Sequence, residues 1–144
     1  MTEGFIYPVL DYDVVDGDTV KCVLDLGFGA RMKMSVRIHG INTPEKRGSE
    51  KTAGLPVRDV LVRWLEGHEL WAQSLGWGKY AGRCLGSVWW DSDDGEERMT
   101  VQDYILQHGL GKPYDGGSRD EFTQEELDMI TATCKTLLEE VDKE

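Results

Sequence analysis

Residues 5–39 read FIYPVLDYDVVDGDTVKCVLDLGFGARMKMSVRIH. Two turn signals interrupt this stretch, Asp16-Gly17-Asp18 and Gly27-Phe28-Gly29, and Asp and Gly are favoured in turns for backbone reasons. The segments beside the turns are rich in β-branched and aromatic residues, and apolar and polar side chains alternate along them. The pattern predicts a three-strand meander with one apolar face, with strands over Phe5–Val15, Thr19–Leu26 and Arg31–His39.

The spacing of apolar residues changes after the meander. A polar loop over residues 40–54 precedes a helical stripe, with Pro56 in its first turn and Gly67 as its stop. Two more strands, a short helix capped by Thr100 and a C-terminal amphipathic helix follow. We expect these elements over His68–Leu75, Arg83–Trp90 and Val101–His108, and after the capping box of Thr123 and Glu126.

Five short strands with a helix between the third and fourth favour a mixed β/α (α+β) fold, a five-stranded OB-fold barrel with about three helices. The length of 144 residues suits a single hydrophobic core. We expect the barrel domain over residues 1–118. The acidic amphipathic helix, within residues 119–144, is expected to pack on the same domain.

The negative net charge of the whole chain conceals a basic segment in the middle of the sequence. The chain has 16 basic and 27 acidic residues, a net charge of −11, which taken whole argues against a phosphate-rich partner. Residues 21–83, however, carry eleven basic and six acidic residues, a net charge of +5. A local basic face therefore remains for an anionic partner.

The cysteines and the first residues bear on the compartment. Cys22, Cys84 and Cys134 are odd in number and form no C-x-x-C pair, which argues against a disulfide framework and against a zinc ribbon. The N-terminal residues lack the basic and apolar segments of a secretory signal. We therefore expect an intracellular, cytoplasmic protein with no membrane segment, and we expect a monomer.

Residues that can act on a phosphate occur in two polar loops and at strand ends. These residues are Asp16, Asp18, Arg37, Glu45 and Arg83. Carboxylates suit a hard cation, and arginines bind phosphate through paired donors. Together they favour phosphodiester hydrolysis, in which cations stabilise charge on the phosphate oxygens and a base activates water. Taken singly, each also has an ordinary interpretation as a turn residue or a solvated surface charge.

Four blocks of sequence resemble the staphylococcal nuclease-like (thermonuclease) family, in the same order and over roughly residues 5–117. The family has an OB-fold and cleaves DNA and RNA with Ca²⁺, so the resemblance implies the same fold and chemistry here. The blocks are Val15-Asp16-Gly17-Asp18-Thr19-Val20, Val36-Arg37-Ile38-His39-Gly40-Ile41-Asn42-Thr43-Pro44-Glu45, Gly78-Lys79-Tyr80-Ala81-Gly82-Arg83 and His108-Gly109-Leu110-Gly111-Lys112-Pro113-Tyr114.

The resemblance implies a metal site. Asp18 would be the principal carboxylate ligand, the Thr43 backbone carbonyl a second oxygen ligand, and Asp16 would act through an intervening water. Asn42 stands where the best-studied member has a further Asp; its amide oxygen can coordinate, but one negative charge is lost. We therefore expect Ca²⁺, with Mg²⁺ or Mn²⁺ as alternatives.

The resemblance also implies the catalytic and binding residues. Glu45 would position or deprotonate the attacking water, and Arg37 and Arg83 would clamp the scissile phosphate. The segment between Tyr80 and Arg83 is one residue longer than the family's form. Positions that touch the nucleotide in the family are matched by Lys79, Tyr80 and Tyr114.

We expect a metal-dependent nuclease that hydrolyses DNA and RNA with little sequence specificity, by direct attack of water. The alternative is a non-catalytic nuclease-like OB module that binds nucleic acid or protein, which Asn42 and the net charge favour. The acidic C-terminal helix is a candidate surface for a further partner, or a gate that limits non-specific binding.

Overall fold

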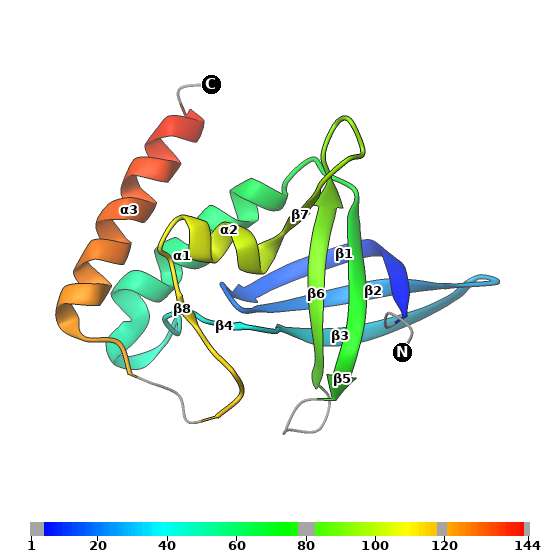
Figure 1. Cartoon of the computed structure of the whole chain (residues 1–144), viewed down its shortest axis with the longest axis horizontal. Helices are drawn as coiled ribbons and strands as arrows, with labels where there is room; N and C mark the ends of the chain where they lie inside the picture. The colour runs from blue at the N-terminus through cyan, green and yellow to red at the C-terminus, as the bar shows by residue number, and fades with distance from the viewer. Residues whose placement is uncertain (1–4, 78–82, 118–120, 143–144) are drawn as a thin grey trace.

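The computed structural model describes residues 5–77, 83–117 and 121–142 (Figure 1). The strands are β1 (Ile6–Asp16), β2 (Thr19–Gly27), β3 (Ala30–Ile38), β4 (Ile41–Asn42), β5 (Leu70–Trp77), β6 (Arg83–Asp91), β7 (Arg98–Thr100) and β8 (Lys112–Pro113). The helices are the short 3-10 helix η1 (Gly48–Glu50) and α1 (Lys51–Leu65), α2 (Val101–Gln107) and α3 (Gln124–Asp142). None of the described helices is long and apolar enough to cross a membrane.

Five strands close into a barrel. β1 pairs antiparallel with β2 and β5, β2 pairs with β3, and β5 pairs with β6. A parallel pairing of β3 with β6 joins the two edges, and β7 extends the sheet beyond β6. The predicted mixed β/α fold, an OB-type five-stranded barrel with three α-helices, is confirmed.

Alternation along the strands produces the core of the barrel. In β2, Val20, Cys22 and Leu24 are buried while Lys21 is exposed, because successive side chains point to opposite faces of a strand. The outward face therefore carries the charged residues.

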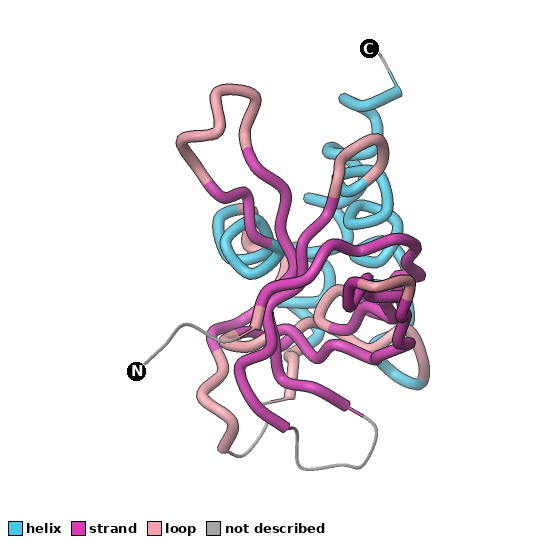
Figure 2. Tube along the Cα trace, turned by 90° about the vertical axis from the view of Figure 1, so that its right-hand side faces the viewer, coloured by secondary structure: helices cyan, strands magenta, loops and turns pink. Residues whose placement is uncertain are grey.

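The α-helices lie toward one end of the barrel, on the left in Figure 1, and the β2–β3 hairpin extends from the other end. Figure 2 views the molecule from the hairpin end, with the helices behind the strands. Helix α1 contacts β1 and buries Val57 and Leu61, and α3 contacts α1 and buries Leu127, Ile130 and Cys134. The helices thus cap the core where β1 ends and β2 begins.

Helix α1 begins earlier than the sequence predicts. The loop expected over residues 40–54 ends before Lys51, and Pro56 lies inside the helix rather than in its first turn. Proline has no N–H, so the helix lacks one internal hydrogen bond there. Ala53, Gly54 and Val57 are buried, and this packing outweighs the local cost of the proline.

Three short strands are absent from the sequence prediction. β4 pairs with β8, and β7 pairs with β6. Each has only two or three residues, too few for alternation to show. The helix caps, in contrast, are as predicted: Thr100 Oγ1 accepts the Asp103 N–H at 3.2 Å, and Thr123 and Glu126 exchange bonds of 3.1 and 2.8 Å.

Candidate functional site

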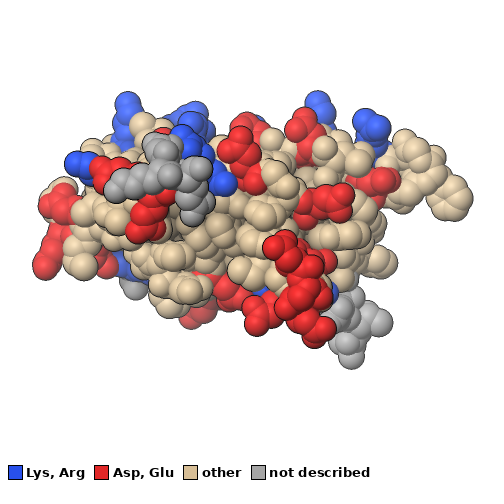
Figure 3. All heavy atoms as spheres, turned by 90° about the horizontal axis from the view of Figure 1, so that it is seen from above, with Lys and Arg blue, Asp and Glu red and all other residues tan. Residues whose placement is uncertain are grey.

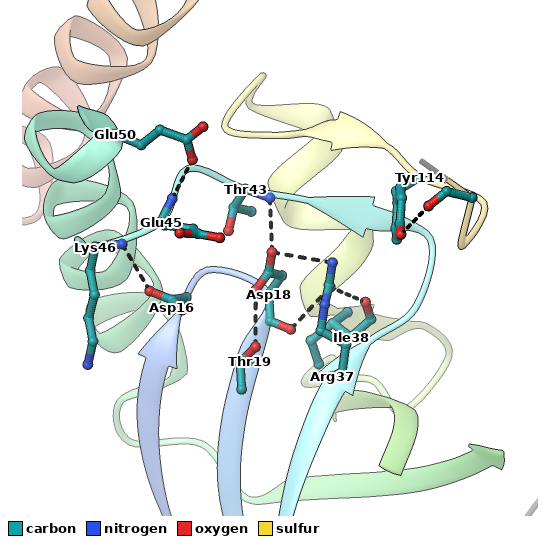
Figure 4. A network of polar contacts seen from close by, with 11 residues as sticks. Asp16, Asp18, Thr19, Arg37, Ile38, Thr43, Glu45, Lys46, Glu50 and Tyr114 are labelled. Carbon is teal, nitrogen blue, oxygen red and sulfur yellow. Dashed lines mark hydrogen bonds and ion pairs between the residues drawn. The ribbon is translucent and has the colours of Figure 1, made fainter. Parts of the chain in front are cut away.

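The candidate site lies near α1, where β1 and β3 end and β2 begins. Asp16 ends β1 and Asp18 immediately precedes β2, so the hairpin turn brings both carboxylates to one edge of the barrel. Thr19 pairs in register with Arg37 of β3, which places the arginine beside the turn. The loop over residues 43–46 crosses above them (Figure 4).

Asp18 is a buried carboxylate at the centre of this edge, with 8% of its surface exposed. Its Oδ1 accepts the Thr19 hydroxyl at 3.1 Å, and its Oδ2 accepts the Thr43 backbone N–H at 3.1 Å. The Arg37 Nη2 lies 3.5 Å from the same Oδ2. Burial of this charge is therefore offset by three polar partners.

Arg37 is fixed by the backbone as well as by Asp18. Its Nη1 donates to the Ile38 carbonyl at 2.9 Å and to the Asp18 carbonyl at 3.4 Å. Its guanidinium carbon lies 5.7 Å from the centre of the Tyr114 ring. A guanidinium has five N–H donors, and within the described residues these contacts account for three of them.

Three carboxylates hold the loop over residues 43–46. Thr43 donates its N–H to Asp18, Glu45 donates to Glu50 Oε1 at 2.9 Å, and Lys46 donates to Asp16 Oδ1 at 3.2 Å. Pro44, between them, has no N–H. Every backbone N–H of this loop is thus bound to a carboxylate, which fixes the backbone from which the exposed Glu45 side chain projects.

Two glycines allow the close packing that the loop requires. A Cβ on Gly54 of α1 would lie 2.0 Å from the Glu45 carbonyl oxygen. A Cβ on Gly17 would lie 2.5 Å from Cγ1 of Val57 and 3.0 Å from the Thr43 side chain. The turn, the loop and α1 can meet only because these two side chains are absent.

The second carboxylate, Asp16, is half-buried beside charges of both signs. Burial is the largest influence and raises its pKa; the Lys46 backbone N–H lowers it, the Asp18 charge raises it, and the Lys46 and Arg83 charges lower it. Asp16 therefore lies close to another carboxylate and to two cations from different elements.

Two hollows border the site. The first, about 460 Å³, is lined by Asp16, Thr19, Glu45 and Arg83 together with Lys21, Lys46 and Arg47 among others, and we call it the Arg83 groove. The second, about 540 Å³, is lined by Asn42, Lys112, Tyr114 and neighbouring residues. Asp18 and Arg37 connect the two, since Asp18 bonds to Thr19 and Arg37 contacts Tyr114.

The oxygen donors fit a hard cation held by few protein ligands. The carboxylates of Asp16 and Asp18, the Thr43 carbonyl and the Asn42 amide are all oxygen donors, the kind Ca²⁺ and Mg²⁺ prefer. Within the residues that the structure describes, no three His, Cys, Asp or Glu side chains gather as a metal site.

The structure brings Asp16, Asp18, Arg37, Thr43 and Glu45 together and puts Arg83 in the same groove as Asp16 and Glu45. Asn42 is buried on β4 and, like Tyr114, lines the second hollow, where the Tyr114 hydroxyl donates to the Gly117 carbonyl at 2.7 Å. The predicted nucleotide contacts Lys79 and Tyr80 lie outside the described residues.

Sequence reasoning missed Glu50. A glutamate in a three-residue 3-10 helix carries no periodic signal, whereas its burial and its bond to the Glu45 N–H indicate a role. No family model matches the chain, and no curated protein matches it either.

Proposed function

We propose that the protein is a metal-dependent nuclease that hydrolyses phosphodiester bonds of DNA and RNA with little sequence specificity. One observation carries the proposal: the Arg83 groove and the adjoining pair of Asp18 and Arg37 bring together carboxylates and arginines from four separate segments of the chain. Phosphodiester hydrolysis needs this combination, since a base must activate water while cations meet the charge on the phosphate.

Glu45 is the proposed general base. Its carboxylate is exposed to the groove while its backbone is held by Glu50, and Figure 4 shows the side chain leaving the loop on the side of Asp16 and Asp18. A carboxylate on an anchored backbone can accept the proton of a water that attacks phosphorus directly. No covalent enzyme intermediate is required.

Arg83 and Arg37 are the proposed phosphate ligands. Arg83 is exposed in the groove beside Asp16 and Glu45. Within the described residues, the contacts of Arg37 account for three of its five N–H donors. Because guanidinium donors bind phosphate oxygens in pairs, both residues would stabilise the negative charge that develops as water attacks.

Asp18, Asp16, the Thr43 carbonyl and the Asn42 amide are the residues that would hold Ca²⁺, with Mg²⁺ or Mn²⁺ as alternatives. A bound divalent cation supplies Lewis-acid stabilisation of the phosphate and lowers the pKa of water. The buried Asp18 carboxylate would keep its position through Thr19 and Thr43 whether or not the cation is bound.

The test is cleavage of single- and double-stranded DNA and of RNA, each with Ca²⁺, Mg²⁺, Mn²⁺ or EDTA. The variants are Glu45→Gln and Arg83→Ala, with Glu69→Gln and Arg31→Ala as controls that change the same residue types at exposed positions outside the groove. We expect cation-dependent cleavage that both site variants lose and both controls keep.

Binding of nucleic acid without cleavage under every cation would refute the nuclease and favour the alternative, a non-catalytic OB module. Equal cleavage by the wild-type protein and Glu45→Gln would refute the role of Glu45 as base. Loss of activity in the controls as great as in the site variants would show that net charge, rather than the groove, is what matters.

A further inference from the structure

The Arg83 groove has more basic side chains than the binding of one phosphate requires. Besides Arg83 it is lined by Lys21, Lys46 and Arg47, none of which the proposed reaction uses. The acidic residues that line it are Asp13, Asp16 and Glu45, so four basic side chains face three acidic ones. The groove is therefore slightly basic, although the whole chain has a net charge of −11. In Figure 3 acidic side chains are scattered over the visible face, whereas basic ones gather mainly along one margin.

These basic residues come from two sides of the groove: the strand side, with Lys21 and Arg83, and the loop side, with Lys46 and Arg47. Lys21 of β2 pairs in register with Ser35 of β3, and Ser35 pairs with Arg83 of β6, so Lys21 and Arg83 lie in one row across the barrel. Two strand spacings separate them, about 10 Å. Lys46 and Arg47 border the groove from the loop side, where Figure 4 shows the Lys46 side chain running past Asp16.

The basic side chains of the groove form no close ion pair in the described part of the chain, although the charges of Lys46 and Arg83 act on Asp16. In residues 5–77, 83–117 and 121–142, Lys21, Lys46, Arg47 and Arg83 make no ion pair with a carboxylate. Other basic residues do: Arg37 pairs with Asp18, Arg58 with Asp59, and Lys112 with Glu126 at 2.9 Å. Four basic residues that have no close carboxylate partner in the described part of the chain thus line the same groove as Glu45, the proposed base.

We propose that Lys21, Lys46 and Arg47 bind the phosphate next to the scissile one, so that the groove recognises a polynucleotide strand rather than an isolated phosphodiester. The inference rests on the proposed function for the position of the scissile phosphate. A hollow of about 460 Å³ has the size of sites that hold a small ligand, and it accommodates a short stretch of one strand. Contacts from Lys and Arg to phosphate add affinity without reading sequence.

The test compares how the variant Lys21→Ala/Arg47→Ala cleaves two substrates. The variant removes one basic residue from the strand side of the groove and one from the loop side. One substrate is a short single-stranded DNA oligonucleotide, and the other is a nucleoside aryl phosphodiester with a single phosphate. The control is Arg31→Ala/Lys135→Ala, which removes the same two charges from exposed positions outside the groove. Binding of a labelled oligonucleotide is also measured by fluorescence anisotropy at several salt concentrations, in Ca²⁺ with the Glu45→Gln background.

We expect the ratio of kcat/KM for the oligonucleotide to kcat/KM for the aryl diester to fall about tenfold in the groove variant, from lost charged contacts discounted for exposure. The slope of log Kd against log salt should fall by about 1. The control should match the wild-type protein in both measurements.

An unchanged substrate ratio, an unchanged salt slope, or an equal effect in the control would overturn the inference. If the wild-type protein cleaves neither substrate, the nuclease proposal fails, and the anisotropy measurement alone then decides whether the groove binds a polynucleotide. Wild-type cleavage with equal losses on both substrates in the groove variant would instead leave the nuclease standing and refute the neighbouring-phosphate site.

Discussion

Replacing Glu50 with Ala tests whether one buried carboxylate holds the loop that carries the proposed base. Glu50 Oε1 accepts the Glu45 N–H at 2.9 Å. A hydrogen bond to a charged group contributes about 1.5–3 kcal/mol. Since the Glu45 side chain is exposed and water can reach part of the loop, we expect a loss near the lower end, about 1.5 kcal/mol of the free energy of unfolding. In a chain of this length that lowers Tm by about 4 °C.

The same change should lower kcat about tenfold and affect KM less, because the Glu45 backbone loses its anchor while Arg37 and Arg83, the proposed ligands of the scissile phosphate, lie on strands outside this loop. Glu50→Gln retains an acceptor oxygen and should lose about half as much stability. Urea unfolding followed by tryptophan fluorescence and steady-state DNA cleavage measure both effects, with the exposed Glu69→Ala as control. Wild-type stability and kcat in Glu50→Ala would refute the reasoning, as would equal damage from Gln and Ala.

Three further predictions concern backbone packing, charge and capping. Gly54→Ala places a Cβ 2.0 Å from the Glu45 carbonyl and should destabilise the fold by about 3 kcal/mol, measured by urea unfolding against Thr52→Ala, an exposed position of the same helix. Asp16→Asn should stabilise the protein at neutral pH. Burial raises the pKa of Asp16 in the folded state, so the wild-type protein loses stability when this carboxyl ionises as the pH rises through that pKa. The uncharged Asn side chain avoids this loss. The gain of the Asn variant should vanish below about pH 4. Thr123→Ala removes the N-cap of α3 and should cost about 1 kcal/mol in thermal unfolding, whereas an unchanged Tm would contradict that role.

The barrel could be predicted from the sequence because its strands are long enough for alternation and its turns carry strong local signals. Val20, Cys22 and Leu24 are buried as their spacing predicts. The early start of α1 could not be predicted, because Pro56 is a local signal against the middle of a helix and only packing overrides it. The pairing of β4 with β8 joins two-residue strands far apart in sequence, for which no local pattern exists.

The residue types of the site could be predicted from the sequence, but the contacts between these residues could not. The proximity of Asp18 and Arg37 depends on the register that pairs Thr19 with Arg37, and a one-residue slip would put Arg37 on the other face. Likewise, the role of Glu50 depends on the fold of residues 43–50. Sequence reasoning identifies residue types suited to phosphodiester chemistry, whereas the positioning bonds emerge only in three dimensions.

The most direct test of the central claim is the rate of DNA hydrolysis by the wild-type protein and by Glu45→Gln, purified side by side and assayed with Ca²⁺ and with EDTA. The account predicts hydrolysis by the wild-type protein that requires the cation, and a loss of about 10²–10⁴-fold in the variant, the range that a general base contributes. Equal rates for the two proteins, or no hydrolysis under any divalent cation, would contradict it.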